Sequence, residues 1–178
     1  MSAFVAEDPS LRSSRFAVIP GVLHTDSSWG AGTTEYALDA ARAAKTGAVY
    51  VLPVELDARL PMIMRDDLVR GLHLLTMAEK GALKEEGGGY AMAGGSFAAR
   101  ELFDAIRSRV HSFRFEATDA ADEEALLEAS PAALFARLWP DSLSGESAAR
   151  DLGFTAKVTE VNEMADLLLG VEEAKGEL

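Results

Sequence analysis

The sequence predicts an α/β (or α+β) fold, a single domain in which a mixed β-sheet of about four to five strands packs with helices. Short apolar runs of strand length alternate along the 178 residues with segments whose apolar residues recur at helical spacing. Two of the runs are apolar throughout, as in strands covered on both faces, and two alternate apolar with polar residues, as in strands with one wet face. Both kinds together favour a mixed sheet over a purely parallel one.

The first half of the chain is predicted to alternate strands and helices. Residues 1–14 are polar and are interpreted as a flexible N-terminal arm that precedes the single α/β domain. The apolar run 15–23 is a predicted strand, and the alanine-rich segment 33–47 is a predicted helix that ends at its glycine. The run 48–56 is apolar without alternation, which predicts a strand covered on both faces. Leucines at helical spacing predict a helix over 66–81.

The second half is predicted to contain shorter elements. A `GGS` turn at Gly94–Ser96 is expected to lead into a helix with Ser96 as its N-cap. The outline resembles a dinucleotide-binding turn, but `GGSFAA` lacks the second and third glycines of G-x-G-x-x-G, so we interpret it as a tight turn. The predicted order is a strand at 90–93, a helix at 97–109, a strand at 111–117, helices at 118–128, 131–139 and 144–153, a strand at 154–161 and a helix at 162–170.

Composition excludes several classes of function. The net charge is −12 and no segment is strongly basic, which argues against nucleic acid and anionic membranes as partners. The chain has no cysteine, so disulfides, cysteine nucleophiles and cysteine-ligated metals are excluded. The first residues lack the features of a secretory signal, and no apolar run reaches the ~20 residues of a membrane span, so a cytoplasmic protein is predicted.

A loop rich in glycine, serine and threonine joins the first predicted strand to the first helix. In `HTDSSWGAGTTEY` (24–36), Gly30, Gly32, Thr33 and Thr34 stand where backbone N–H groups and a helix N-terminus can hold an anion. The loop superficially resembles the glycine-rich loop of P-loop nucleotide-binding proteins, but that pattern requires a lysine where Thr33 stands. Two interpretations remain, a capped strand-to-helix turn and a ligand-binding loop for a small anion.

His24 and Asp26 are the candidate catalytic residues. They follow the first predicted strand, and the carboxyl ends of strands are where open α/β sheets place their sites. The pair could serve acid–base chemistry or hold a divalent metal, and otherwise His24 is a loop residue and Asp26 a turn former. The metal and any cofactor stay unknown, because a third ligand would have to come from His73, His111, Glu55 or Asp57.

Two features favour binding of a protein partner or self-association. The stretch 116–128 carries six acidic residues and no basic one. An apolar stripe over 134–139 is either core or interface. The half-exposed strands 111–117 and 154–161 are candidate sheet edges for pairing. The candidate interface residues are Leu134, Phe135, Leu138 and Trp139.

These observations support two hypotheses. The preferred one is a non-catalytic partner-binding or assembly protein that acts through its acidic surface, sheet edges and apolar helix stripe, because no complete catalytic constellation is present. The alternative is a small α/β enzyme or ligand-binding protein with its site at the strand ends, where His24, Asp26 and the loop Gly30–Thr34 handle an anionic small molecule or a divalent metal.

Overall fold

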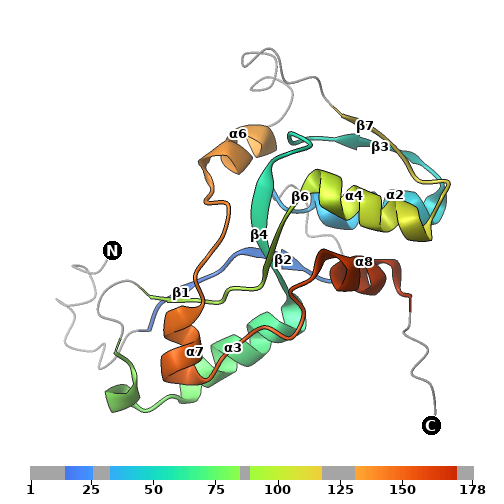
Figure 1. The fold of residues 1–178 in the computed structure, drawn as a ribbon. Helices are drawn as coiled ribbons and strands as arrows, with labels where there is room; N and C mark the ends of the chain where they lie inside the picture. Colours follow the sequence, from blue (N-terminus) through green and yellow to red (C-terminus); the bar gives the residue numbers. More distant parts are fainter. Residues whose placement is uncertain (1–14, 26–32, 85–88, 118–130, 172–178) are drawn as a thin grey trace, which may run out of the picture.

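The structure, a computed structural model, describes residues 15–25, 33–84, 89–117 and 131–171 and confirms the α/β class (Figure 1). The predicted arm 1–14 and the predicted helix 118–128 lie outside these residues. The elements are β1 (Ala17–Val18), β2 (Gly21–Leu23), α2 (Tyr36–Thr46), β3 (Val49–Leu52), β4 (Arg59–Met64), α3 (Arg65–Met77), the 3₁₀ helix η1 (Lys80–Ala82), β5 (Tyr90–Ala91), β6 (Gly95–Ala98), α4 (Ala99–Arg109), β7 (Arg114–Ala117), α6 (Pro131–Leu138), α7 (Glu146–Leu152) and α8 (Val161–Leu169).

The described strands form three small sheets where the sequence predicts one. In the central sheet β4 lies between β2, to which it is parallel, and β6, to which it is antiparallel. β1 pairs in parallel with β5, and β3 pairs in parallel with β7. The predicted strand 15–23 is divided between two of these sheets at Pro20, which has no backbone N–H to continue a ladder.

The strand that is covered on both faces is β4. Every residue from Leu60 to Met64 is buried, yet no strand is predicted between the predicted strand 48–56 and the predicted helix 66–81. The prediction that 48–56 is covered on both faces is wrong. β3 alternates, with Val49 and Val51 exposed while Leu52 is buried.

The predicted strand 154–161 is also wrong. The residues before α8 form no strand, and the backbone N–H groups of Lys157 and Val158 donate instead to the side chain of Asp67. The alternation of apolar and polar residues is real, because one side of this segment packs on the core and the other is exposed. The backbone of the segment, however, donates to the side chain of Asp67 and not to a neighbouring strand.

Most of the described helices belong to one of two groups, and α6 lies apart from both (Figure 1). Helices α2, α4 and α8 pack against one another, and α3 lies beside α7. Small alanine side chains fill the buried face of α2, and the helix ends as predicted at Gly47, whose φ of 73° is in the left-handed region. Within the described segments, no helix has the length and apolar character needed to cross a bilayer.

The core consists of two clusters of buried residues, and the larger one contains a group of aromatic rings around Phe103. Tyr36, Tyr50 and Phe113 each meet the Phe103 ring edge-on, with centroids 5.5–6.4 Å apart. The Tyr36 side chain is 1% exposed, and its hydroxyl has no hydrogen-bond partner among the described residues. Burial, together with the nearby Tyr50 and Glu101, raises the pKa of Tyr36 well above its usual range, so the hydroxyl stays neutral.

We expect Tyr36→Phe to leave the free energy of unfolding unchanged or to raise it by about 1 kcal/mol, because a buried hydroxyl without a partner is a cost that phenylalanine removes. Urea unfolding followed by circular dichroism measures the change. A loss of about 1 kcal/mol or more would show that the hydroxyl does have a partner in solution.

Candidate functional site

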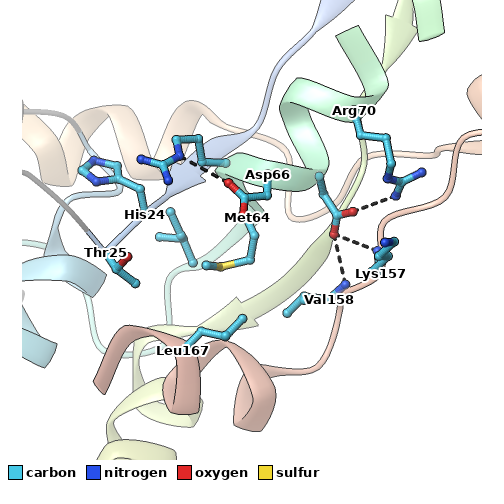
Figure 2. Close-up of a pocket in the computed structure, with 11 residues that line it drawn as sticks. His24, Thr25, Met64, Asp66, Arg70, Lys157, Val158 and Leu167 are labelled. Carbon is cyan, nitrogen blue, oxygen red and sulfur yellow. Dashed lines mark hydrogen bonds and ion pairs between the residues drawn. The ribbon is translucent and has the colours of Figure 1, made fainter. Parts of the chain in front are cut away.

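A pocket of about 370 Å³ opens where two parallel strands end. β2 and β4 run side by side, and their last paired residues, Leu23 and Met64, both line the pocket. This is the position at which open α/β sheets place ligands. Figure 2 shows the lining side chains, which come from the ends of β2 and β4, the first half of α3, the segment that leads into α8, and α8 itself: Leu23, His24, Thr25, Met64, Arg65, Asp66, Asp67, Arg70, Lys157, Val158 and Leu167.

One wall of the pocket is fixed by Asp67, a buried acidic residue in the first turn of α3. Its carboxylate accepts hydrogen bonds from the backbone N–H groups of Lys157, at 2.7 Å, and Val158, at 3.1 Å. Its other oxygen accepts from the Arg70 guanidinium at 2.7 Å (Figure 2). Residues 157 and 158, the wall segment, form no strand and pair with no strand in the described part of the chain. They are instead attached to α3 through the side chain of Asp67.

Arg70 strengthens the same attachment. Its guanidinium also donates to the backbone carbonyl of Thr155 at 2.5 Å and lies over the Phe154 ring, 4.9 Å from the centroid. Burial by itself raises the pKa of Asp67, but the hydrogen bonds from Arg70 and the two backbone N–H groups, with the Arg70 charge, outweigh it and hold the pKa below its usual range. Asp67 is therefore ionised at neutral pH.

The remaining charges give the pocket a positive character. Asp66 pairs with Arg65 at 3.4 Å, and Asp67 is engaged with Arg70, so both acids that line the pocket have a basic partner. Across the part of the chain that the structure describes, no acidic group lies within ion-pair distance of the Lys157 ammonium. With His24 on the opposite wall, the arrangement suits a small anionic ligand.

The predicted anion loop is described only in part. Asp26, Gly30 and Gly32 lie outside the described residues. Thr33 and Thr34 form the turn before α2 and line neither this pocket nor the smaller one beside it. Thr34 packs on β2, since a Cβ on Gly21 would lie 2.3 Å from its methyl carbon.

The predicted additional metal ligands do not gather at His24. Glu55 forms an ion pair with Arg137, and Asp57 accepts from Arg100 at 2.8 Å. His73 and His111 are exposed. No group of three or more residues with metal-binding side chains occurs within the described ranges, so they give the metal interpretation no support.

The predicted apolar stripe is divided in the structure. Phe135 and Leu138 on α6 are 51% and 70% exposed, whereas Trp139, just after the helix, packs partly buried against the main core. Leu134 belongs to α6, and the position of its side chain is not described. An interface role for the exposed pair stays a prediction.

Of the residues that line the pocket, His24 was a candidate from the sequence, whereas Asp67, Arg70 and Lys157 were not. Asp67 follows an apolar run and begins a helix, which is a weak signal for a site. Its partners are 90 and 91 residues away along the chain, in a segment predicted to be a strand. No spacing rule relates positions so far apart.

Comparison with known proteins identifies similar solved structures. No protein-family profile matches the chain. The GalE-like L-threonine dehydrogenase from Cupriavidus necator (holo form) is 31% identical with a TM-score of 0.73, over 88% of this chain and 47% of that one. The L-threonine 3-dehydrogenase from Trypanosoma brucei is 26% identical with a TM-score of 0.76, over 88% and 45%. A nucleoside-diphosphate-sugar epimerase from Agrobacterium tumefaciens, at 20% identity and a TM-score of 0.65 over 88% and 43%, shares the fold.

These similarities overturn the preferred hypothesis from the sequence. The structures that resemble this chain are enzymes, so the non-catalytic assembly protein is wrong and the alternative, an α/β enzyme or ligand-binding protein, is the better supported. The sequence argued against an enzyme because it shows no local catalytic motif, whereas the pocket is built from three segments far apart in the chain. The chain spans about half the length of the solved relatives that it matches.

Proposed function

We propose that this chain forms the substrate-binding part of an oxidoreductase that acts on L-threonine or a related small amino acid. The observation that carries the proposal is the 31% identity and TM-score of 0.73 to the L-threonine dehydrogenase from Cupriavidus necator over 88% of the chain. The pocket volume of about 370 Å³ lies at the lower end of the usual range for small-molecule sites, which favours a small substrate.

The charges around the pocket support a zwitterionic ligand. In this proposal the substrate carboxylate lies near Lys157, and its ammonium group lies near Asp66. Asp67 keeps Lys157 in place through the backbone, so the cation is positioned before the ligand arrives.

Oxidation of a hydroxyl group requires an acceptor for the hydride, and the residues described here do not fit a dinucleotide. The pattern G-x-G-x-x-G occurs nowhere in the 178 residues. α3 follows β4 directly and α4 follows β6 directly, without a glycine-rich turn in which a pyrophosphate could lie. We therefore assign substrate binding, and no step of hydride transfer, to these side chains.

We expect L-threonine to bind the chain saturably, and L-threoninol, which lacks the carboxylate, to bind about tenfold more weakly, because one charge-assisted contact is lost. Lys157→Ala should weaken L-threonine binding by a similar factor and leave L-threoninol binding unchanged. Isothermal titration calorimetry measures both ligands.

Lys84→Ala is the matched control, because Lys84 is exposed and does not line the pocket. Equal affinity for the two ligands, or an equal effect of the two lysine substitutions, would contradict the proposed placement of the carboxylate. Absence of saturable L-threonine binding would reject the proposed substrate.

A further inference from the structure

His24 and Thr25 also line a second cavity, of about 90 Å³, formed with side chains of α2 and α8. Leu38 and Ala41 of α2 and Leu168 of α8 are buried and give it an apolar floor. Its volume is about three times the ~30 Å³ that a water molecule occupies in the liquid. The space therefore suits a group of a few heavy atoms.

The polar side chains around this cavity are predominantly basic. Arg42 and Lys45 lie three residues apart on α2, hence on one face of the helix, and His24 joins them from the end of β2. Among the lining residues that belong to the described part of the chain, none is an aspartate or glutamate. In a protein with a net charge of −12, the Arg42 and Lys45 charges make the potential beside this space locally positive, although Asp39 pairs with Arg42.

Both long side chains can donate to a ligand. Arg42 donates to Asp39 at 2.7 Å through one guanidinium nitrogen, and a guanidinium has five N–H donors. Among the residues with described positions, Lys45 forms no ion pair, and its ammonium lies 3.9 Å from where a Cβ on Gly170, the C-cap of α8, would stand.

We propose that this cavity is a binding subsite for a phosphate-sized oxyanion, held by Lys45 and Arg42 with His24 at the boundary to the larger pocket. The oxyanion is either free phosphate or the phosphoryl group of a ligand whose remainder lies in the larger pocket, since His24 and Thr25 line both spaces. The subsite goes beyond the proposed function and does not depend on it.

Calorimetric titration of the full chain with inorganic phosphate tests the subsite. We expect saturable binding in the range of about 1 mM, weakened about tenfold in Lys45→Ala and in Arg42→Ala. Both positions are exposed, and circular dichroism verifies that the variants fold. Lys84→Ala should bind phosphate as the unaltered chain does, because Lys84 lines neither space.

O-phospho-L-threonine distinguishes the two sources of the oxyanion. If it binds about tenfold more tightly than inorganic phosphate, and both Lys45→Ala and Lys157→Ala remove the gain, one ligand spans both spaces. If O-phospho-L-threonine and inorganic phosphate bind with equal affinity, free phosphate is the ligand of the subsite. Failure of phosphate to saturate at about 10 mM, or binding that neither Lys45→Ala nor Arg42→Ala weakens, overturns the subsite. Loss of L-threonine binding with phosphate binding intact rejects the proposed function alone.

Discussion

Replacing Asp67 with alanine is expected to lower the free energy of unfolding by about 3 kcal/mol, because one buried carboxylate satisfies three donors at once. The substitution leaves the N–H groups of Lys157 and Val158 without an acceptor and Arg70 without its anion. The wall of the larger pocket then loses its attachment to α3. Urea unfolding measures the energy, and amide hydrogen exchange should show lost protection at residues 157 and 158.

Asp66→Ala is the control for this prediction. Asp66 is adjacent in sequence and has the same charge, but its side chain is 91% exposed and pairs with the exposed Arg65. We expect a change within about 0.5 kcal/mol. If the two alanine substitutions cost the same, the hydrogen bonds to the wall contribute nothing to stability and the proposed attachment is wrong.

The pH dependence of the Asp67 effect has a definite sign. The pKa of Asp67 is lowered in the folded protein, so the carboxylate contributes stability that is fully present above its unfolded pKa. This contribution is lost as the pH falls through the folded pKa. The difference in unfolding free energy between the unaltered chain and Asp67→Ala should therefore be constant at neutral pH and become smaller in acid.

The features predicted correctly from the sequence are those that neighbouring residues in the chain determine. Gly47 ends α2 because a left-handed residue follows the helix, and His24 lies in a pocket because it follows a parallel strand. Each conclusion needed only the residues on either side. The fold class followed in the same way, from the alternation of strand-like and helix-like segments.

The parts that failed depend on contacts between distant segments. Nothing in `RLPMIM` shows that helices will cover β4 on both sides, and its proline argues against a central strand. The segment before α8 alternates like a strand, but Asp67 takes the donors that a neighbouring strand would use. The pocket could not be predicted for the same reason, since its walls come from residues 23–25, 64–70 and 157–167.

Replacing Gly95 with alanine is expected to lower the free energy of unfolding by about 3 kcal/mol, the upper end of the usual cost of overpacking. A Cβ on Gly95 would lie 2.2 Å from the backbone carbonyl oxygen of Thr159 and 3.1 Å from Met164. The oxygen belongs to the main chain, so it cannot move aside by changing a rotamer. The interpretation of Gly94–Ser96 as a tight turn with Ser96 as N-cap is wrong, because Gly95 and Ser96 lie in β6 and the N-cap of α4 is Ala98. The second glycine of the `GGS` motif is instead required by the close approach of two backbones.

Gly81→Ala provides the matched control in the same chain. Nothing lies within 4 Å of a Cβ at Gly81, and its backbone is outside the left-handed region. Alanine there should be neutral or stabilise by up to about 1 kcal/mol, because it restricts the unfolded chain. Urea unfolding of both variants separates the clash from the general effect of losing a glycine. Equal values for the two would contradict the close approach of Gly95 and Thr159.

Because Thr159 directly follows the wall segment, Gly95→Ala should also reduce amide protection at residues 157 and 158, whereas Gly81→Ala should not.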